Sequence, residues 1–339
     1  MKLIKTQEAV GQVLCHDITQ IIKGVKKDAV FRKGHIITEE DIPVLLSVGK
    51  DSVYIWENDE SMLHENDAAE ILKDICMGSN IRATAPKEGK IELIAETDGL
   101  LTVDSERVYA VNTLGEMMIA TRHGGFAVKK GDKLCGTRVI PLVIKKEYME
   151  RAKEAAGSAP LINVVPFKKK TAGVITTGNE VYRGRIADTF TPVIADKLAE
   201  YGCEMGLHVI LSDDNEKITA AINDMLGSGL DMVICTGGMS VDPDDRTPLA
   251  IKNSGARVVS YGAPVLPGAM FLLAYTDDGR PVVGLPGCVM YARRTIFDLV
   301  LPSLIAGVRV TAERLAGYGE GGLCLDCAEC RFPDCSFGK

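Results

Sequence analysis

Residues 234–245 read ICTGGMSVDPDD and combine two kinds of group that could do chemistry together. Gly237 and Gly238 follow an apolar, strand-like run and can present backbone N–H groups to an anion. Asp242 and Asp245 follow closely, although carboxylates repel an anion. A Mg²⁺ ion held by these two aspartates would resolve this conflict, because it bridges carboxylate and phosphate oxygens. The stretch therefore predicts a phosphorylated ligand that binds together with Mg²⁺.

Two further turns follow expected strands and carry groups that suit the same ligand. They are TTGNE at residues 176–180 and GLPG at residues 284–287. Glycine permits close backbone approach, hydroxyl and amide groups offer hydrogen bonds, and a helix expected from about Val289 would point its positive end at an anion. Each turn alone is equally typical of a simple tight turn. Together they give the candidate ligand contacts Thr177, Gly178, Asn179, Gly237, Gly238, Ser240, Pro286 and Gly287.

Strands and helices are expected to alternate from residue 171 onward and to position these turns. The strand-like runs TAGVIT, MGLHVIL, LDMVICT and RPVVGL are separated by helix patterns. One of these helices is expected to be capped by Thr191, with Pro192 in its first turn and Gly202 at its end. The alternation predicts an α/β fold with a mostly parallel sheet and flanking helices. In such sheets ligands bind beyond the carboxyl ends of the strands, where all three turns lie.

The rest of the chain is expected to form separate segments before and after this domain. Short apolar runs such as KIELIAE, GLLTVD, RVYAVN and MMIATR predict a β-rich unit, and KKEYMERAKEAAGSAP predicts a linking helix. The predicted division is 1–78, a mixed α/β unit; 79–145, the β-rich unit; 146–170, the helical linker; 171–310, the α/β domain; and 311–339, a Gly-rich and Cys-rich tail.

Composition excludes several classes of function. The formal charge of −7 gives no general attraction to nucleic acid or to an anionic membrane. The chain shows no signal peptide or long apolar span, so a cytoplasmic location is expected. Neither GxGxxG after a strand, nor GxxxxGK[ST], nor GxSxG occurs, and the five histidines form no spaced metal motif.

The segments TTGNE, DTF, TGGMSVDPDD and GLPG, in this order, resemble the molybdopterin-binding domain of the molybdenum insertases, the family of bacterial MoeA and the gephyrin E domain. The resemblance is best over about residues 171–310. It implies a ligand that is molybdopterin or its adenylate, molybdate as metal donor, and insertion of molybdenum with release of AMP. It also implies catalytic roles for Ser240, Asp245 and Glu180, a homodimer, and a molybdoenzyme that receives the cofactor.

Three positions depart from that family's motifs. Asn179 replaces the aspartate of its GDE turn, Ala269 replaces a lysine, and Cys288 replaces an asparagine. Two alternatives to an insertase therefore stay open. One is a non-catalytic molybdopterin carrier or chaperone. The other is a cofactor-sensing interaction protein with a metal-binding tail.

The tail segment CLDCAECRFPDC places Cys324, Cys327, Cys330 and Cys335 in a C-x₂-C-x₂-C-x₄-C array. Four thiolates so close in sequence suit a tetrahedral zinc ion or an iron–sulfur cluster. Unligated thiols, or disulfides formed on oxidation, are the alternatives. The glycines before the array predict a flexible approach, which would let the tail reach a partner or the pterin site.

Overall fold

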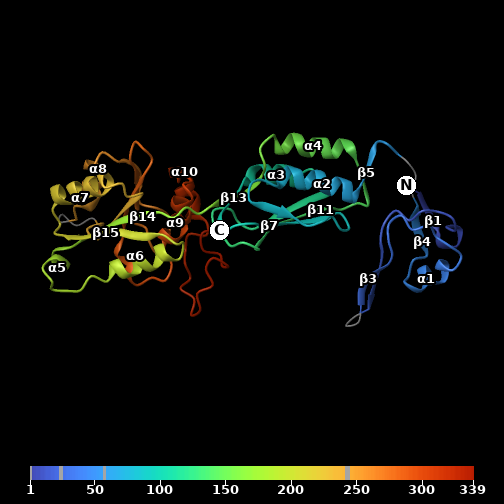
Figure 1. Ribbon diagram of the computed structural model, residues 1–339, viewed down its shortest axis with the longest axis horizontal. Helices are drawn as coiled ribbons and strands as arrows, with labels where there is room; N and C mark the ends of the chain where they lie inside the picture. Colours follow the sequence, from blue (N-terminus) through green and yellow to red (C-terminus); the bar gives the residue numbers. More distant parts are fainter. Residues whose placement is uncertain (1, 23–25, 56–58, 241–244) are drawn as a thin grey trace. The chain divides into compact units, whose positions relative to one another are not determined.

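The computed structural model describes residues 2–22, 26–55, 59–240 and 245–339. The chain divides into two compact units (Figure 1). The first holds Met1–Glu96, Val103–Arg122 and Gly131–Asn163, and the second holds Thr97–Thr102, His123–Lys130 and Val164–Lys339. The five-part division expected from the sequence stays a prediction. Among the described residues, every helix is too short or too polar to span a membrane.

The start of the first unit is built from two antiparallel strand pairs, a short helical turn and one helix. Its small apolar core includes Leu14, Ile37, Leu45 and Val53. Gly49, with φ of 76°, follows the end of the helix, where a left-handed conformation favours glycine. These elements are β1 (Lys2–Lys5) paired with β4 (Ser52–Ile55), β2 (Ile18–Ile22) paired with β3 (Lys26–Phe31), η1 (Thr6–Glu8), and α1 (Asp41–Ser47).

The remainder of the first unit is a four-stranded antiparallel sheet with helices and a second strand pair. Helix α2 buries Ala68, Ala69 and Leu72. The sheet order is β6 (Ile81–Ala83), β7 (Lys90–Ala95), β11 (Lys133–Val139), β9 (Met117–Thr121); β5 (Met62–His64) pairs with β12 (Val143–Lys145); the helices are α2 (Glu65–Cys76), α3 (Ser105–Asn112) and α4 (Lys146–Ala156).

The run RVYAVN lies in helix α3, so its prediction as part of a β-rich unit is wrong. Asp104 caps this helix by accepting a hydrogen bond from the backbone N–H of Arg107 at 3.0 Å. A short run that mixes apolar and polar residues fits either a strand or one face of a helix. In this segment the Asp104 cap stabilises the helix.

The second unit contains a six-stranded mixed sheet, as an α/β fold predicts. Its order is β15 (Glu204–Leu211), β14 (Thr171–Thr177), β16 (Met232–Thr236), β19 (Pro281–Leu285), β18 (Leu272–Tyr275), β17 (Arg257–Tyr261). The first four strands are parallel, and β18 and β17 add antiparallel pairs. A smaller sheet of β10 (Ala127–Val128), β8 (Gly99–Val103) and β13 (Ile162–Pro166) belongs mostly to this unit.

Helices cover both faces of the six-stranded sheet (Figure 1). Alternate strand residues explain this, because Val174 packs into the core beneath α6 and α9 whereas Ile175 packs beneath α7 and α8. The two opposed apolar faces fix the sheet as a central layer. The helices of the unit are α5 (Asn179–Tyr182), α6 (Phe190–Ala199), α7 (Asn215–Gly227), α8 (Thr247–Asn253), α9 (Ile296–Ala306) and α10 (Ala312–Ala316), with the 3₁₀ turns η2 (Gly287–Met290) and η3 (Gly317–Gly319).

Two predictions about helix ends are wrong. Helix α6 begins at Phe190, and the Asp188 carboxylate accepts the N–H bonds of its first turn, so Thr191 is not the cap. After GLPG the chain forms only the 3₁₀ turn η2, and the next α-helix begins at Ile296. A helix dipole at GLPG therefore does not exist.

Candidate functional site

A pocket of about 540 Å³ lies where the turns after β14 and β16 meet. Strand β14 lies between β15 and β16 in the sheet. The chain passes from β14 outward to β15 and then returns to β16 on the other side of β14, so the direction of strand order reverses between β14 and β16. Such a switch point leaves a crevice at the carboxyl ends of the strands. The predicted residues that line the pocket are Thr177, Gly178, Asn179, Glu180, Gly237, Gly238 and Asp245.

The glycines of these turns allow close backbone packing that a side chain would prevent. Gly178 has φ of 139° and Gly237 has φ of 82°. A Cβ atom on Gly237 would lie 2.2 Å from the carbonyl oxygen of Thr177, and one on Gly238 would lie 2.9 Å from Oγ1 of Thr247. The two strand ends therefore pack backbone against backbone, and their amides border the same pocket.

Three carboxylates line this pocket: Glu180, Asp213 and Asp245. The first residue of α5 fixes one of them, since the backbone N–H of Asn179 donates to Oδ2 of Asp213 at 3.0 Å. Burial raises the pKa of the Asp213 carboxyl, the Asn179 bond opposes this, and the charges of Glu180 and Asp245 raise the pKa further. The pocket thus concentrates negative charge that a cation would neutralise.

Asp213 was not among the residues predicted from the sequence. It follows β15 directly in the segment LSDD, so the rule that ligand sites lie beyond strand ends points to it. The sequence does not show that Asp213 lies beside Asn179, because the two residues are 34 positions apart and meet only in the folded sheet. Met290 from η2 and the segment that precedes α6 complete the wall.

Other predicted residues lie outside the lining of this pocket. Ser240 is exposed, Pro286 is buried and Gly287 is exposed, and none of the three lines it. Gly287 also has open space where a Cβ would stand, so no close approach requires a glycine there. Asp242 lies outside the described residues. The roles of these four residues in ligand or Mg²⁺ binding stay predictions.

A hydrogen-bonded cluster beneath the pocket holds the segment before α6. The Oγ1 atom of Thr176, at the end of β14, lies 3.1 Å from both Oδ2 of Asp188 and Nε2 of His208. The same Asp188 side chain caps α6 and bonds to Thr191. Hydrogen bonds to the carboxylate hold the pKa of Asp188 below its usual value against the opposing effect of burial. This cluster positions Thr189 and Phe190 in the pocket wall.

The Asp213→Asn variant is expected to melt at a higher temperature than the natural protein at neutral pH. The folded state raises the pKa of Asp213, so its ionisation lowers stability as pH rises through that pKa, and the penalty is absent below the usual carboxyl range. Asparagine removes the charge and can still accept the bond from Asn179. Melting temperatures from about pH 3 to about pH 8 check this. The exposed Asp277→Asn variant is the control, and a lower melting temperature for Asp213→Asn at every pH would contradict the expectation.

Comparison with known proteins places this pocket in a recognised kind of domain. Residues 173–306 match the family described as "Probable molybdopterin binding domain", and residues 3–57 match a domain of unknown function, DUF8806. The pocket lies inside the first match. Residues 173–306 therefore form an α/β domain that resembles this family, and the resemblance expected from the sequence is confirmed for this domain.

Two curated relatives extend the comparison. A molybdopterin molybdenumtransferase of Synechococcus elongatus is 24% identical over 233 residues, which cover 66% of this chain and 55% of the relative. A CinA-like protein of Mycolicibacterium vanbaalenii is 38% identical over 76 residues, covering 22% of this chain and 18% of the relative. This chain thus spans about half of the first relative and under a fifth of the second. The solved structure of MoaB, a molybdopterin biosynthesis enzyme of Thermus thermophilus, is 24% identical with a TM-score of 0.36, covering 40% of this chain and 91% of that chain.

Proposed function

We propose that this protein acts in molybdenum cofactor biosynthesis by binding adenylated molybdopterin and inserting molybdenum from molybdate, with release of AMP. The observation that supports this most directly is the pocket itself, where two glycine turns and three carboxylates meet at the switch point of the sheet. Relatives named molybdopterin molybdenumtransferase support the reaction class. Five of the six cysteines outside the tail are buried free thiols, which favours the reducing cytoplasm as the location.

The composition of the pocket wall makes Mg²⁺ part of this proposal. Its described lining contains three carboxylates and no lysine or arginine, so the charged side chains that a phosphate ligand would meet there are all negative. When bound, Mg²⁺ would neutralise both partners, and it needs only one or two protein carboxylates because phosphate and water complete its shell. No group of three or more His, Cys, Asp or Glu within the described ranges is arranged to hold a metal by itself. Asp245 and Asp213 are the proposed ligands from the described chain.

The protein's own groups then have separate roles. The backbone amides at Gly178, Gly237 and Gly238 bind phosphate oxygens, and the narrow backbone packing holds those amides in place before the ligand arrives. Glu180, on the first turn of α5, faces the reacting phosphate as the acid–base group. Water attacks the phosphoanhydride bond of the adenylate, so AMP leaves and molybdopterin keeps its own phosphate. The two dithiolene thiols then bind molybdenum, and one oxo group of molybdate leaves as water with the two thiol protons.

A non-catalytic carrier is the second candidate function. The position where the family has a lysine is Ala269, which is exposed and does not line the pocket. A site without that cation can still hold the pterin while failing to stabilise the leaving phosphate. The carrier thus shares the binding step with the insertase but lacks the cleavage step.

The test is to incubate the purified protein with adenylated molybdopterin, Mg²⁺ and molybdate, and to follow bound pterin and released AMP together. An insertase releases AMP only when both molybdate and Mg²⁺ are present. Tight pterin binding without AMP release selects the carrier. Absence of binding with and without Mg²⁺ would contradict both.

A further inference from the structure

The C-terminal tail is folded onto the second unit, so the expected flexible approach is not what the structure shows. Two backbone hydrogen bonds of 2.8 Å hold the start of the tail against Leu266. The N–H of Leu266 donates to the carbonyl oxygen of Gly322, and the N–H of Cys324 donates to the carbonyl oxygen of Leu266. At the other end Gly338 N–H donates to Gly321 O at 2.9 Å, and Phe337 is 3% exposed within the core of the unit. The cysteine array is therefore a loop closed at both ends.

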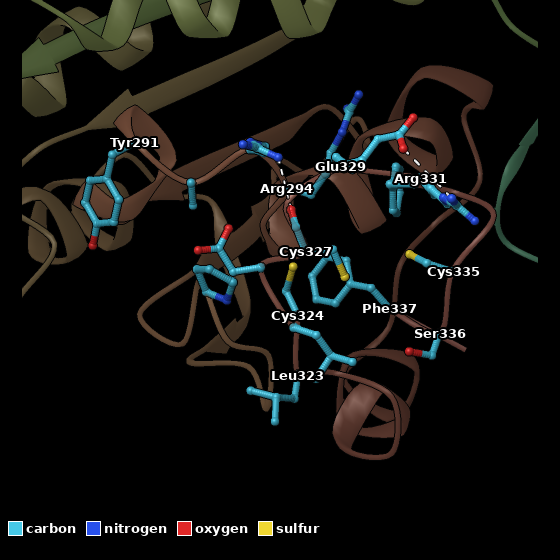
Figure 2. Close-up of a pocket in the computed structure, with 17 residues that line it drawn as sticks. Tyr291, Arg294, Leu323, Cys324, Cys327, Glu329, Arg331, Cys335, Ser336 and Phe337 are labelled. Carbon is cyan, nitrogen blue, oxygen red and sulfur yellow. Dashed lines mark hydrogen bonds and ion pairs between the residues drawn. The ribbon is translucent and has the colours of Figure 1, made fainter.

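All four tail cysteines line one pocket of about 570 Å³ (Figure 2). Cys324 and Cys335 are partly buried and pack against the apolar core, whereas Cys327 and Cys330 are exposed. Asp326 has φ of 47°, rare for a residue other than glycine, and it turns the chain between Cys324 and Cys327. Residues 324–331 contain no helix or strand, so the two exposed thiols sit on an irregular loop above two anchored thiols.

Arg293 holds this loop, and Arg294 packs beside it. Nη1 of Arg293 donates to the carbonyl oxygens of Cys327 and Ala328 at 3.1 and 2.9 Å. Within the described residues no ion pair links Arg293 to a carboxylate. The Arg294 guanidinium lies 5.1 Å from the ring centroid of Phe332, and both residues line the pocket.

The acidic side chains of this pocket, Asp326 and Glu329, are exposed to solvent. Glu329 lies 3.8 Å from Arg331, where solvent screens the pair. Arg294 is already paired with the buried Asp298 and with Glu200, each at 2.9 Å. Among the described residues, Arg293 is therefore the cation that contacts the loop without such a pair.

Disulfides do not account for the array. All ten cysteines of the chain are unpaired in the structure, and five of the six outside the tail are buried, where thiols react slowly. In a reducing compartment, clustered thiols are more typical of metal ligands than of cross-links. Four cysteines within twelve residues match the ligand number of a zinc ion or an iron–sulfur cluster.

We propose that this pocket binds a metal centre through the thiolates of Cys324, Cys327, Cys330 and Cys335, with the loop of residues 325–331 closing over it. The described residues hold no preformed group of three metal ligands, so binding draws the exposed thiols toward the anchored pair. Metal binding would also fix Arg293, and with it the segment from Met290 to Arg294. Met290 lines the pterin pocket, and the residues after it line the cysteine pocket.

The experiment uses the full chain, purified and reduced without oxygen, in two arms. One arm receives Zn²⁺, and the other receives Fe³⁺ with sulfide and excess dithiothreitol, which supplies the electrons needed for a mixed-valence cluster. Unbound metal is removed before elemental analysis and visible spectroscopy. We expect stoichiometric binding in one arm: about one zinc ion per chain, or a cluster with visible absorption that is absent from the zinc arm. The arm that loads identifies the metal.

Variants and thiol labelling connect that metal to these residues. The double variant Cys327→Ser and Cys330→Ser changes only exposed side chains, and it should lose at least about tenfold in metal affinity. Ser336→Ala, in the same pocket, should retain it. Bound metal should slow alkylation of the four tail thiols, read by mass spectrometry. Failure of both arms to load, equal loading of the double variant, or disulfides among the four cysteines in reduced protein would overturn the proposal.

Discussion

Replacing Asp245 with asparagine is expected to reduce molybdate-dependent AMP release by about 10²-fold or more while pterin binding stays measurable. Asp245 lines the pocket beside Glu180 and Asp213, and its charge raises the pKa of the latter. Asparagine keeps the size of the side chain but removes the charge that binds Mg²⁺ or orients the attacking oxygen, and such groups contribute about 10²–10⁴ in rate. Single-turnover release of AMP from the bound adenylate measures the effect.

The matched control for this variant is Asp224→Asn, an exposed aspartate on α7 outside the pocket. It makes the same chemical change in the same unit and should release AMP at the natural rate. If Asp245→Asn also turns over at the natural rate, Asp245 has no part in the reaction. If neither variant nor the natural protein cleaves the adenylate although all three bind the pterin tightly, the carrier function is the correct one.

Replacing Gly237 with alanine is expected to abolish pterin binding and to lower the denaturant midpoint of the second unit. The φ of 82° at this position disfavours a side chain by about 1–2 kcal/mol. In addition, the new Cβ would overlap the carbonyl oxygen of Thr177, 2.2 Å away. Relief of this overlap must separate the two turns whose amides border the pocket. Urea unfolding and pterin fluorescence titration measure the two effects.

Gly279→Ala separates backbone strain from that overlap. Gly279 has φ of 86°, close to the value at Gly237, but nothing lies within 4 Å of the position of its Cβ. The control should therefore lose only the strain energy and keep its pterin affinity. Equal losses of stability and affinity in the two variants would show that the packing of the Thr177 and Gly237 turns does not shape the site.

Most strands and helices of the second unit follow from the sequence, because their signals are local. TAGVIT, LDMVICT and RPVVGL are buried on both faces in β14, β16 and β19, which is why each reads as a continuous apolar run. The failures have local causes too. RVYAVN carries no period long enough to separate a strand from a helix, and the apolar stretch after GLPG did not reveal that its first turn is 3₁₀.

The tail shows a different limit of local signals. The glycines before the array predict freedom, yet Gly322 makes a close contact, because a Cβ there would lie 2.3 Å from the carbonyl oxygen of Pro264. Gly338, after the array, also packs closely, because a Cβ there would lie 2.4 Å from Leu299. Glycine thus served packing rather than flexibility. The pattern of residues cannot distinguish these uses, since both need only the absence of a side chain.

The sequence by itself predicted the class of domain, the glycine turns, and Glu180 and Asp245 as candidate acids of the site. It could do so because strand ends and turns are signalled by residues that are adjacent in the chain. Only the tertiary structure brought Asp213 to these acids and placed the four cysteines around one pocket with Arg293. The physical reason is that charge and ligand geometry depend on distances between strands and loops far apart in the chain. Those distances are set by the packing of helices on both faces of the sheet.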